Sequence, residues 1–572
     1  EDLVPLSRSQ RNIWDLEQTF PGTSMNNISA TIRIRGRIDI SVLQTALNTV
    51  LAADDSLRAR ITLRGKTPLQ YHAPFSALNC PVLDFSLTNQ EGIEHWETAV
   101  TREAVPLLDS PLCHFYLFRD GETSGGMLVK THHIVSDGWS QLLLCNRIAQ
   151  TYLSLLRGQA VPLDACPDYR VHVEEEEAYL TSRTFQKDLD YWTRTLAEAG
   201  PPSTLKTVRG AVLSPVGRRR TFRLPEVLNH AIYSFCTRHR VAPFAVYYMA
   251  LAIYLKRMGG PNRFTIGVPI HNRTNYTARQ TSGMFVSTLP FCNELDEDWT
   301  PEQFVRHLNE AWYGLLRHQR FPFSEIEALP RPHADRLFHI ALSYQDSKIY
   351  ESEDASVVFS GRWHYGGYQA EHLCIHLTNL EDHRRYTVDY DYLTQLFSDR
   401  EIEVFHEGLC HILEQALSAT DRPIRALNIL TTPQREQVLY TFNRREKPLR
   451  RSSLYQAFSA VADHYPARTA VIAGGVRTSY ARLRELALSC CAQIVQQLPE
   501  GKELTAILLP RGLELLTATV GVMASGNAWV LLSPALPRAR LEQLLASSGA
   551  ALLVTDQATL AACGGPFALP SV

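Results

Sequence analysis

The feature that most constrains the fold is a short loop between a strand-like segment and a helix-like segment. Residues 127–130 form an apolar run before the loop, and residues 141–153 after it repeat apolar side chains at helical spacing. The loop itself reads His132-His133-Ile134-Val135-Ser136-Asp137-Gly138. Because such a loop is held by regular elements at both ends and can face a cleft, it is a typical place for functional residues.

The residues of this loop leave three interpretations open. In the first, a buried histidine beside an ordinary Asp-Gly turn serves packing alone. In the second, His133 and Asp137 bind a metal ion, although neither Cys nor Glu stands nearby at ligand spacing. In the third, a histidine accepts a proton from an attacking nucleophile, Asp137 holds the loop, and Gly138 leaves room for a substrate beside the backbone.

Length and composition limit the class of protein. At 572 residues the chain is too long for one core, so several domains are expected. With a net charge of -2, the chain has no overall positive electrostatic field that would attract nucleic acid or an anionic membrane. No apolar run is long enough to span a bilayer, and no signal peptide opens the chain. The 11 cysteines lack disulfide or metal spacing, which favours reduced thiols in a cytoplasmic enzyme.

The whole string from His132 to Gly138 resembles the His-His-x-x-x-Asp-Gly signature of condensation domains of non-ribosomal peptide synthetases. That superfamily is related to chloramphenicol acetyltransferase and to CoA-dependent acyltransferases. Other stretches resemble further family motifs in the same order. They are a Ser-x-x-Gln-x-x-x-Trp run at 7–14, a Gly-x-Phe-Val-Asn-Thr-like run at 283–288 with Ser287 in place of Asn, and a His-Gln-x-x-Pro-Phe run at 318–323.

The resemblance implies a role for each residue of the site. His133 is the catalytic residue, which either accepts the proton of an attacking amine or orients that amine. His132 is a packing residue, and Gly138 belongs to the motif. Asp137 is architectural, and Arg273 is its implied partner in an ion pair. Physically, a buried carboxylate is costly unless it is paired, and a planar guanidinium can hold it with two hydrogen bonds.

The resemblance also implies an α/β fold. It consists of two chloramphenicol-acetyltransferase-like lobes in a V-shaped pseudo-dimer with a tunnel through the cleft, followed by a partial α/β adenylation subdomain. The expected domains are an N-terminal lobe at 1–178, a C-terminal lobe at 179–431, a polar linker at 432–452 and a truncated adenylation subdomain at 453–572.

The last of these regions resembles the early part of adenylation domains. Residues 476–483 are similar to a Thr-Tyr-x-x-Leu stretch with Ser479 inserted, and residues 521–532 are similar to a later motif. No Ser/Thr/Gly-rich phosphate loop followed by Lys occurs before Val572. We therefore expect this region not to adenylate a substrate without the remainder of an adenylation domain.

The function implied by the resemblance is amide formation by an acyltransferase. The amine of a carrier-bound aminoacyl acceptor would attack the thioester of an acyl donor, and both groups would arrive on phosphopantetheine arms of carrier proteins, or the donor as an acyl-CoA. No cofactor and no metal is expected to bind directly. A fatty acyl donor is slightly preferred, because Asp54-Asp55 stand where elongating domains usually carry His and Glu, and starter-type domains resemble this variant.

Two other functions stay open. An elongating condensation domain would join peptidyl and aminoacyl groups from two carriers. A non-catalytic docking module would recruit partner enzymes, although the intact His133 and Asp137 argue against it.

Overall fold

The structure is a computed structural model that describes residues 3–36, 38–161, 165–208, 213–332, 336–345, 356–382, 385–444 and 452–572. It divides into two compact units, Glu1–Phe442 and Asn443–Val572. The division falls inside the stretch 432–452 that the sequence assigns to a linker. The beginning of that stretch is helical, with α13 (Thr432–Glu436) continuing into a π-helical turn (Gln437–Thr441).

The first lobe of the larger unit is built on a five-stranded sheet in the order β12-β2-β7-β6-β5. Its strands are β2 (Asn27–Gly36), β5 (Val82–Asp84), β6 (Cys113–Arg119), β7 (Ser124–His132) and β12 (Val357–His364). A smaller sheet, in the order β1-β4-β3, contains β1 (Val4–Pro5), β3 (Ala59–Arg64) and β4 (Thr67–His72). The helical elements are α1 (Arg8–Thr19), α2 (Ile40–Ala53), a 3₁₀ turn (Asp55–Arg58), α3 (Gln90–Arg102) and α4 (Gly138–Leu156).

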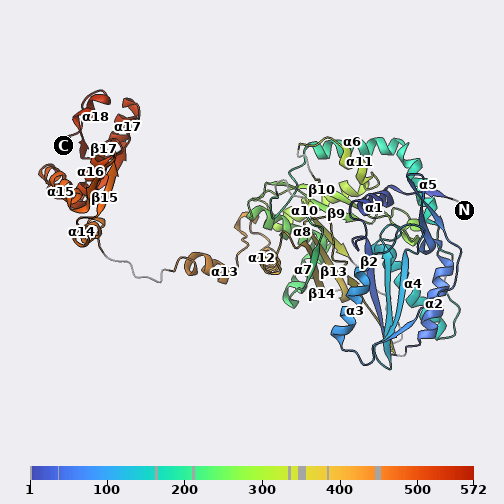
Figure 1. Cartoon of the computed structure of the whole chain (residues 1–572). Helices are drawn as coiled ribbons and strands as arrows, with labels where there is room; N and C mark the ends of the chain where they lie inside the picture. Colours follow the sequence, from blue (N-terminus) through green and yellow to red (C-terminus); the bar gives the residue numbers. More distant parts are fainter. Residues whose placement is uncertain are drawn as a thin grey trace. The chain divides into compact units, whose positions relative to one another are not determined.

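Alternation along β2 explains how helices cover both faces of this sheet (Figure 1). Ile32 and Ile34 point to one face and pack in a core with Leu47 of α2 and Leu144 of α4. Arg33 points to the other face and meets the carboxylate of Glu97 on α3. The sheet therefore holds α4, which follows the histidine loop, against the core.

The second lobe is built on a six-stranded sheet in the order β10-β9-β11-β13-β14-β8. Its strands are β8 (Gly217–Arg223), β9 (Arg263–Ile270), β10 (Ser287–Glu294), β11 (Ile340–Gln345), β13 (Leu373–Asp382) and β14 (Arg385–Leu393). Its helical elements are α7 (Glu226–His239), α8 (Pro243–Arg257), α9 (Tyr276–Gln280), α10 (Pro301–Arg317), α11 (Phe323–Ala328), α12 (Asp399–Ser418) and a 3₁₀ turn (Ile424–Ala426).

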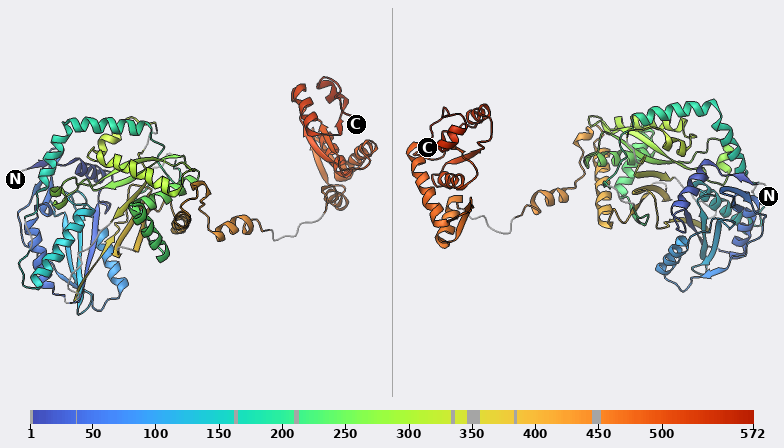
Figure 2. Two further views of the ribbon diagram at one scale, coloured as in Figure 1. Left: turned by 180° about the vertical axis from the view of Figure 1, so that it is seen from behind. Right: turned by 45° about the horizontal axis from the view of Figure 1, so that its top comes forward.

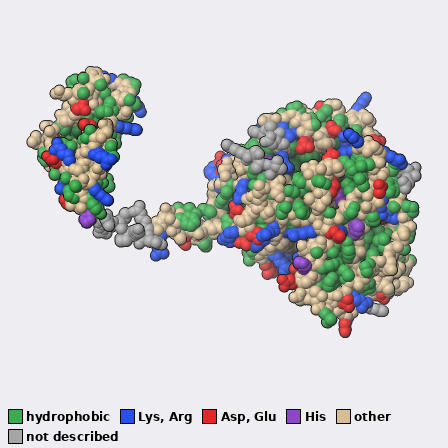
Figure 3. All heavy atoms as spheres, viewed as in Figure 1, with side chains coloured by type: hydrophobic (Ala, Val, Ile, Leu, Met, Phe, Trp, Pro, Cys, Tyr) green, Lys and Arg blue, Asp and Glu red, His purple; other side chains and the backbone are tan. Residues whose placement is uncertain are grey.

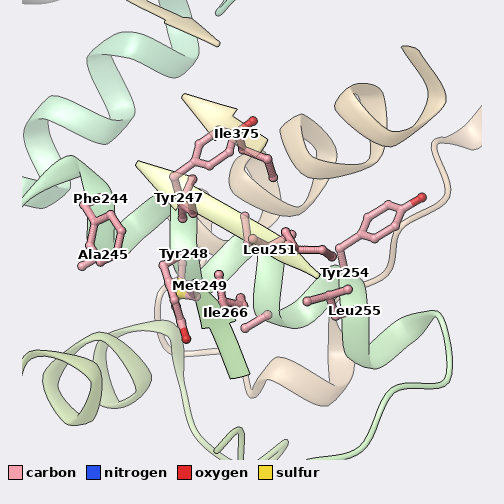
Figure 4. Packing of buried hydrophobic residues seen from close by; sticks show 14 of the residues in the cluster. Phe244, Ala245, Tyr247, Tyr248, Met249, Leu251, Tyr254, Leu255, Ile266 and Ile375 are labelled. Carbon is pink, nitrogen blue, oxygen red and sulfur yellow. The ribbon is translucent and has the colours of Figure 1, made fainter. Parts of the chain in front are cut away.

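Helix α8 forms the centre of the second lobe. Every residue from Phe244 to Leu255 is buried, which is the pattern of a helix surrounded by other elements on all sides. Figure 4 shows α8 side chains such as Tyr247 and Leu251 beside Ile266 of β9 and Ile375 of β13. Helix α8 begins at Pro243, a position where the missing N–H of proline costs no helical hydrogen bond.

The two lobes are not separate segments of the chain. Helices α5 (Tyr169–Leu180) and α6 (Arg183–Ala197) lead from the first lobe to the second along the outside of the unit (Figures 1 and 2). The chain then returns through β12, which pairs antiparallel with β2 from Val357 opposite Gly36 to His364 opposite Ser29. The sequence-based division at 178/179 falls inside α5 and does not anticipate this exchanged strand.

The smaller unit is also α/β. Its parallel sheet has the order β18-β17-β19, and a separate hairpin pairs β15 with β16. Its elements are α14 (Leu454–His464), β15 (Thr469–Ala473), β16 (Val476–Ser479), α15 (Tyr480–Gln497), β17 (Leu504–Leu508), α16 (Leu513–Ala524), β18 (Ala528–Leu532), α17 (Arg538–Ser548), β19 (Leu552–Thr555) and α18 (Gln557–Ala562). The alternating strands and helices agree with the sequence prediction for this region.

Two further observations concern the charges on the surface of the larger unit and the length and apolar character of the helices. Figure 3 shows acidic and basic side chains interspersed on the displayed face of the larger unit, in keeping with the small net charge of the chain. Across the described ranges, none of the helices combines the length and the apolar character required to cross a membrane.

Candidate active site

The histidine loop begins where β7 ends at His132 and finishes where α4 begins at Gly138. Backbone hydrogen bonds hold its first residues on both sides. The N–H of His132 donates to the carbonyl of Leu112 at 2.8 Å, and the N–H of His133 donates to the carbonyl of Asn26 at 2.7 Å. The strand–loop–helix arrangement predicted from the sequence is therefore present.

A glutamine from the first motif also supports the loop. Ser7 and Gln10 form a capping box at the start of α1. The side-chain amide of Gln10, which is buried, donates to the carbonyl of Ile134 at 3.0 Å and to the side-chain oxygen of Gln70 at 3.0 Å. The sequence identifies the run at 7–14 only by its resemblance to a family motif, and it does not predict the contact between Gln10 and the loop.

His132 lies inside the first lobe and is 2% exposed. Its Nδ1 accepts a hydrogen bond from the N–H of Ile134 at 3.1 Å. Its Nε2 lies 3.6 Å from the carboxylate of Glu17. Burial works against ionisation of Glu17, but hydrogen bonds from His132 and Asn26 outweigh burial and lower the pKa of Glu17. Both ring nitrogens of His132 thus have partners within the fold.

His133 is different, because it is only half-buried and one of its nitrogens has no partner. Nδ1 is buried and has no hydrogen-bond partner among the residues that the structure describes. Burial lowers the pKa of His133 below its ordinary value of 6.5, and the carboxylate of Asp137 opposes that change. The imidazole is therefore neutral at pH 7 and able to accept a proton.

Asp137 and Arg273 form a fully buried ion pair between the lobes. Both side chains have 0% exposure. Nη1 of Arg273 donates to Oδ2 of Asp137 at 2.8 Å, and Nη2 donates to Oδ1 at 3.0 Å. The guanidinium also lies over the ring of Phe285, 4.1 Å from its centroid. The structure thus brings together the two residues that the resemblance paired.

Backbone groups complete the surroundings of the Asp137 carboxylate. It caps α4 by accepting from the N–H of Ser140 at 2.8 Å, and it accepts from the N–H groups of Phe285 at 3.0 Å and Val286 at 3.2 Å. Burial raises the pKa of Asp137, but Arg273 and these donors outweigh it, so the pKa lies below its ordinary value. A carboxylate engaged in this way is held as a structural anion, and it is not free to bind a metal ion.

Two glycines near the ion pair differ in their requirements. A Cβ added to Gly283 would lie 2.0 Å from a ring carbon of Tyr169, so close packing demands glycine there. A Cβ added to Gly138 would meet no described atom within 4 Å, and Gly138 is exposed. Packing in the protein therefore gives no reason for glycine at 138, and room for a substrate stays the prediction for that position.

Asp54 forms a second contact between the lobes, which the sequence alone does not predict. This buried carboxylate accepts from Nη1 of Arg147 at 2.9 Å and from Oγ of Ser282 at 2.5 Å. Nη2 of Arg147 also donates to the carbonyl of Gln280 at 2.6 Å. Asp55 pairs with Arg58 instead. These contacts explain why an aspartate stands at position 54. The presence of Asp54 is therefore weaker evidence for a fatty acyl donor.

None of the pockets described in the larger unit has His133 in its lining. The most prominent, of about 440 Å³, lies between α5 and residues 272–278 and includes His172, Tyr179 and Arg320 but not His133. The tunnel implied by the resemblance stays a prediction. In the described ranges, no group of three His, Cys, Asp or Glu side chains is arranged to hold a metal ion.

Comparison with known families decides the class. The family model described as "Condensation domain" matches residues 1–439 of the chain. The family model described as "AMP-binding enzyme" matches residues 458–566. The chain belongs to the condensation domain family. Condensation domains are amide-forming acyltransferases, so the chain is assigned to that class of enzyme. The predicted resemblance and fold class are confirmed.

Curated relatives include components of two synthases from Bacillus subtilis (strain 168). The chain is 28% identical to one component of plipastatin synthase over 563 residues, which cover 97% of the chain and 22% of that relative. It is 28% identical to one component of surfactin synthase over 562 residues, covering 96% of the chain and 16% of that relative. The chain thus spans less than a quarter of the length of these relatives.

Solved structures show the same fold. The first condensation domain of the calcium-dependent antibiotic synthetase, in complex with a substrate analogue, matches with a TM-score of 0.67 and 23% identity over 75% of this chain and 100% of that one. A mutant starter condensation domain of rhizomide synthetase, in complex with C8-CoA, matches with a TM-score of 0.68 and 22% identity over 75% of this chain and 98% of that one.

Proposed function

We propose that this condensation domain joins an acyl group, held as a thioester, to the amine of an aminoacyl group on a carrier protein. The acceptor amine attacks the thioester carbonyl, the C–N bond forms, and the C–S bond breaks. One proton leaves the amine and one proton is taken up by the departing thiolate. Phosphopantetheine arms of partner carriers deliver the groups, or the donor arrives as an acyl-CoA.

The observation that carries this proposal is the contrast between the two histidines. His132 is buried with both ring nitrogens engaged, whereas His133 is partly exposed and has a buried Nδ1 without a described partner. The loop that holds His133 is fixed between two lobes by Asp137 and Arg273. A neutral imidazole at a fixed position can accept a proton from the amine or orient it.

A fatty acyl donor is our preferred substrate class. One structural neighbour is a starter condensation domain whose complex contains C8-CoA, which supports this choice by analogy of fold. An elongating domain that takes a peptidyl group from a donor carrier is the second candidate. Both would act beside carriers and the remainder of an adenylation domain in a longer synthetase.

We expect the full chain to transfer an acyl group onto an aminoacyl carrier protein. The test is to mix it with the loaded acceptor carrier and with acyl-CoA, acyl-carrier or peptidyl-carrier donors, and then to measure the intact mass of the acceptor. A mass increase equal to the acyl group supports the proposal, and an increase only with the peptidyl carrier favours elongation. Binding of the carriers without any mass increase would contradict amide formation and indicate a docking module.

A further inference from the structure

The second lobe contains an apolar pocket that has no role in the contacts described above. Its volume is about 360 Å³, and it lies between α8, α10 and the carboxyl-terminal parts of β9 and β11. Its apolar lining includes Phe244, Ile270, Leu308, Trp312, Leu316 and Leu342. A pocket of this size with an apolar lining is typical of a small-molecule site.

The sheet opens where this pocket lies. Strands β9 and β11 are parallel neighbours, but the structure pairs them at one position, Ala341 opposite Gly267. Beyond that pair, Ile270 and Leu342 both contribute to the pocket wall. The carboxyl ends of parallel strands are a common place for ligands in open α/β sheets.

The pocket adjoins the histidine loop through His271. This residue lines the pocket, and its ring centroid lies 5.5 Å from that of Trp139. Trp139 follows Gly138 directly, and Arg273, two residues after His271, pairs with Asp137. The segment 271–273 therefore contacts the loop on one side and the pocket on the other.

The chemistry of the lining selects the kind of group that fits. The buried side chains of the lining are hydrocarbon. Its polar residues are either half-buried, as are Asn309 and Tyr344, or exposed, as are Arg240, His271 and Tyr313. A peptidyl chain would carry amide groups into this pocket, where each unpaired amide costs free energy. An alkyl chain carries no such groups and gains from leaving water.

We infer that the pocket lined by Phe244, Leu308 and Leu342 binds the alkyl chain of a fatty acyl donor. This inference rests on the proposed amide-forming function and names the donor class. The thioester end points to the histidine loop, and the chain extends past His271 into the second lobe. Each methylene buried in the pocket is expected to raise kcat/KM by about fourfold, the equivalent of about 0.8 kcal/mol, until the pocket is full.

Acyl-chain length is the variable that tests this inference. Acetyl, butyryl, octanoyl and dodecanoyl donors are offered to the full chain, both as CoA thioesters and on a carrier, with one loaded acceptor. We expect kcat/KM to increase from butyryl to octanoyl. The substitution Ala245→Trp fills the pocket and is expected to remove the advantage of octanoyl over butyryl, whereas Trp312→Ala enlarges it and shifts the preference towards dodecanoyl.

The matched control is Trp299→Ala. Trp299 is also half-buried and packs on Phe304 and His307, but it does not line the pocket. We expect this variant to keep the wild-type chain-length profile. If Ala245→Trp does not fold, the shift expected from Trp312→Ala still tests the inference.

The outcomes separate this inference from the proposed function. Equal reaction of all donors by the wild type, or an equal loss for all donors in Ala245→Trp, would overturn the inference and leave amide formation standing. A change in acceptor preference without a change in the donor profile would also overturn it. Failure of every donor to react would refute the proposed function itself.

Discussion

The variant His133→Ala is expected to form the amide about 10²–10⁴ times more slowly than the wild type, which is the usual effect of removing a general base. It should remain folded, because Nδ1 of His133 makes no described hydrogen bond that the substitution would remove. The measurement is single-turnover transfer to a loaded acceptor carrier, followed by intact mass, with thermal unfolding recorded on the same samples.

Two other histidines provide matched controls. His95 is exposed on α3, so His95→Ala should keep both rate and stability. His132→Ala should mainly lower stability, because it removes the acceptor of the Ile134 N–H and the group beside Glu17. A His133→Ala protein that retains the full rate would show that the catalytic assignment is wrong.

The second large effect is expected at the buried ion pair. Asp137→Ala should lower the stability of the larger unit by about 3–5 kcal/mol, because it leaves the guanidinium of Arg273 buried without its counter-ion. It also removes the acceptor for the N–H groups of Ser140, Phe285 and Val286. Denaturant unfolding measures the decrease in the free energy of unfolding. Aggregation of the variant during expression would also indicate this decrease.

A double-mutant cycle isolates the pair itself. Arg273→Met should be destabilising alone, and the double variant Asp137→Ala/Arg273→Met should lose less stability than the sum of the single changes, since no buried charge is left unpaired. The control is the exposed pair Arg306–Glu302 on α10, whose removal should cost less than about 1 kcal/mol. Wild-type stability of Asp137→Ala would contradict the structural role of the pair.

The sequence predicted local features of the site well. Apolar spacing placed the histidine loop between a strand and a helix, and β7 and α4 confirm this. Asp137 caps α4, as an Asp at that position before a helical pattern can. Arg273 came from family resemblance, because nothing in local periodicity connects residues that are 136 positions apart.

Contacts between distant segments were not predictable from the sequence in this way. The exchanged strand β12 has no local signal for pairing with β2, and the bridge from Asp54 to Arg147 and Ser282 depends on how the lobes meet. Glu176 belongs to an acidic run at 174–177, a pattern that by itself is typical of a solvated helix face. It is half-buried, and its carboxylate accepts from the N–H of Arg8 at 2.7 Å. Periodicity reports the face of a helix, but it does not report which distant segment covers that face.

The most direct test of the account is the pH dependence of single-turnover amide formation. Burial disfavours the imidazolium form, so the pKa of His133 lies below 6.5 and the active neutral ring persists at mildly acidic pH. The α-amino group of the acceptor also titrates, with a pKa of about 7.7–8.0, so the wild type and His133→Ala are measured at each pH and the ratio of their rates is taken. We expect the ratio of the wild-type rate to the His133→Ala rate to be constant near pH 7 and to fall as the pH decreases through a midpoint below 6.5. A ratio that does not change with pH would contradict the claim that the neutral ring of His133 serves the attacking amine.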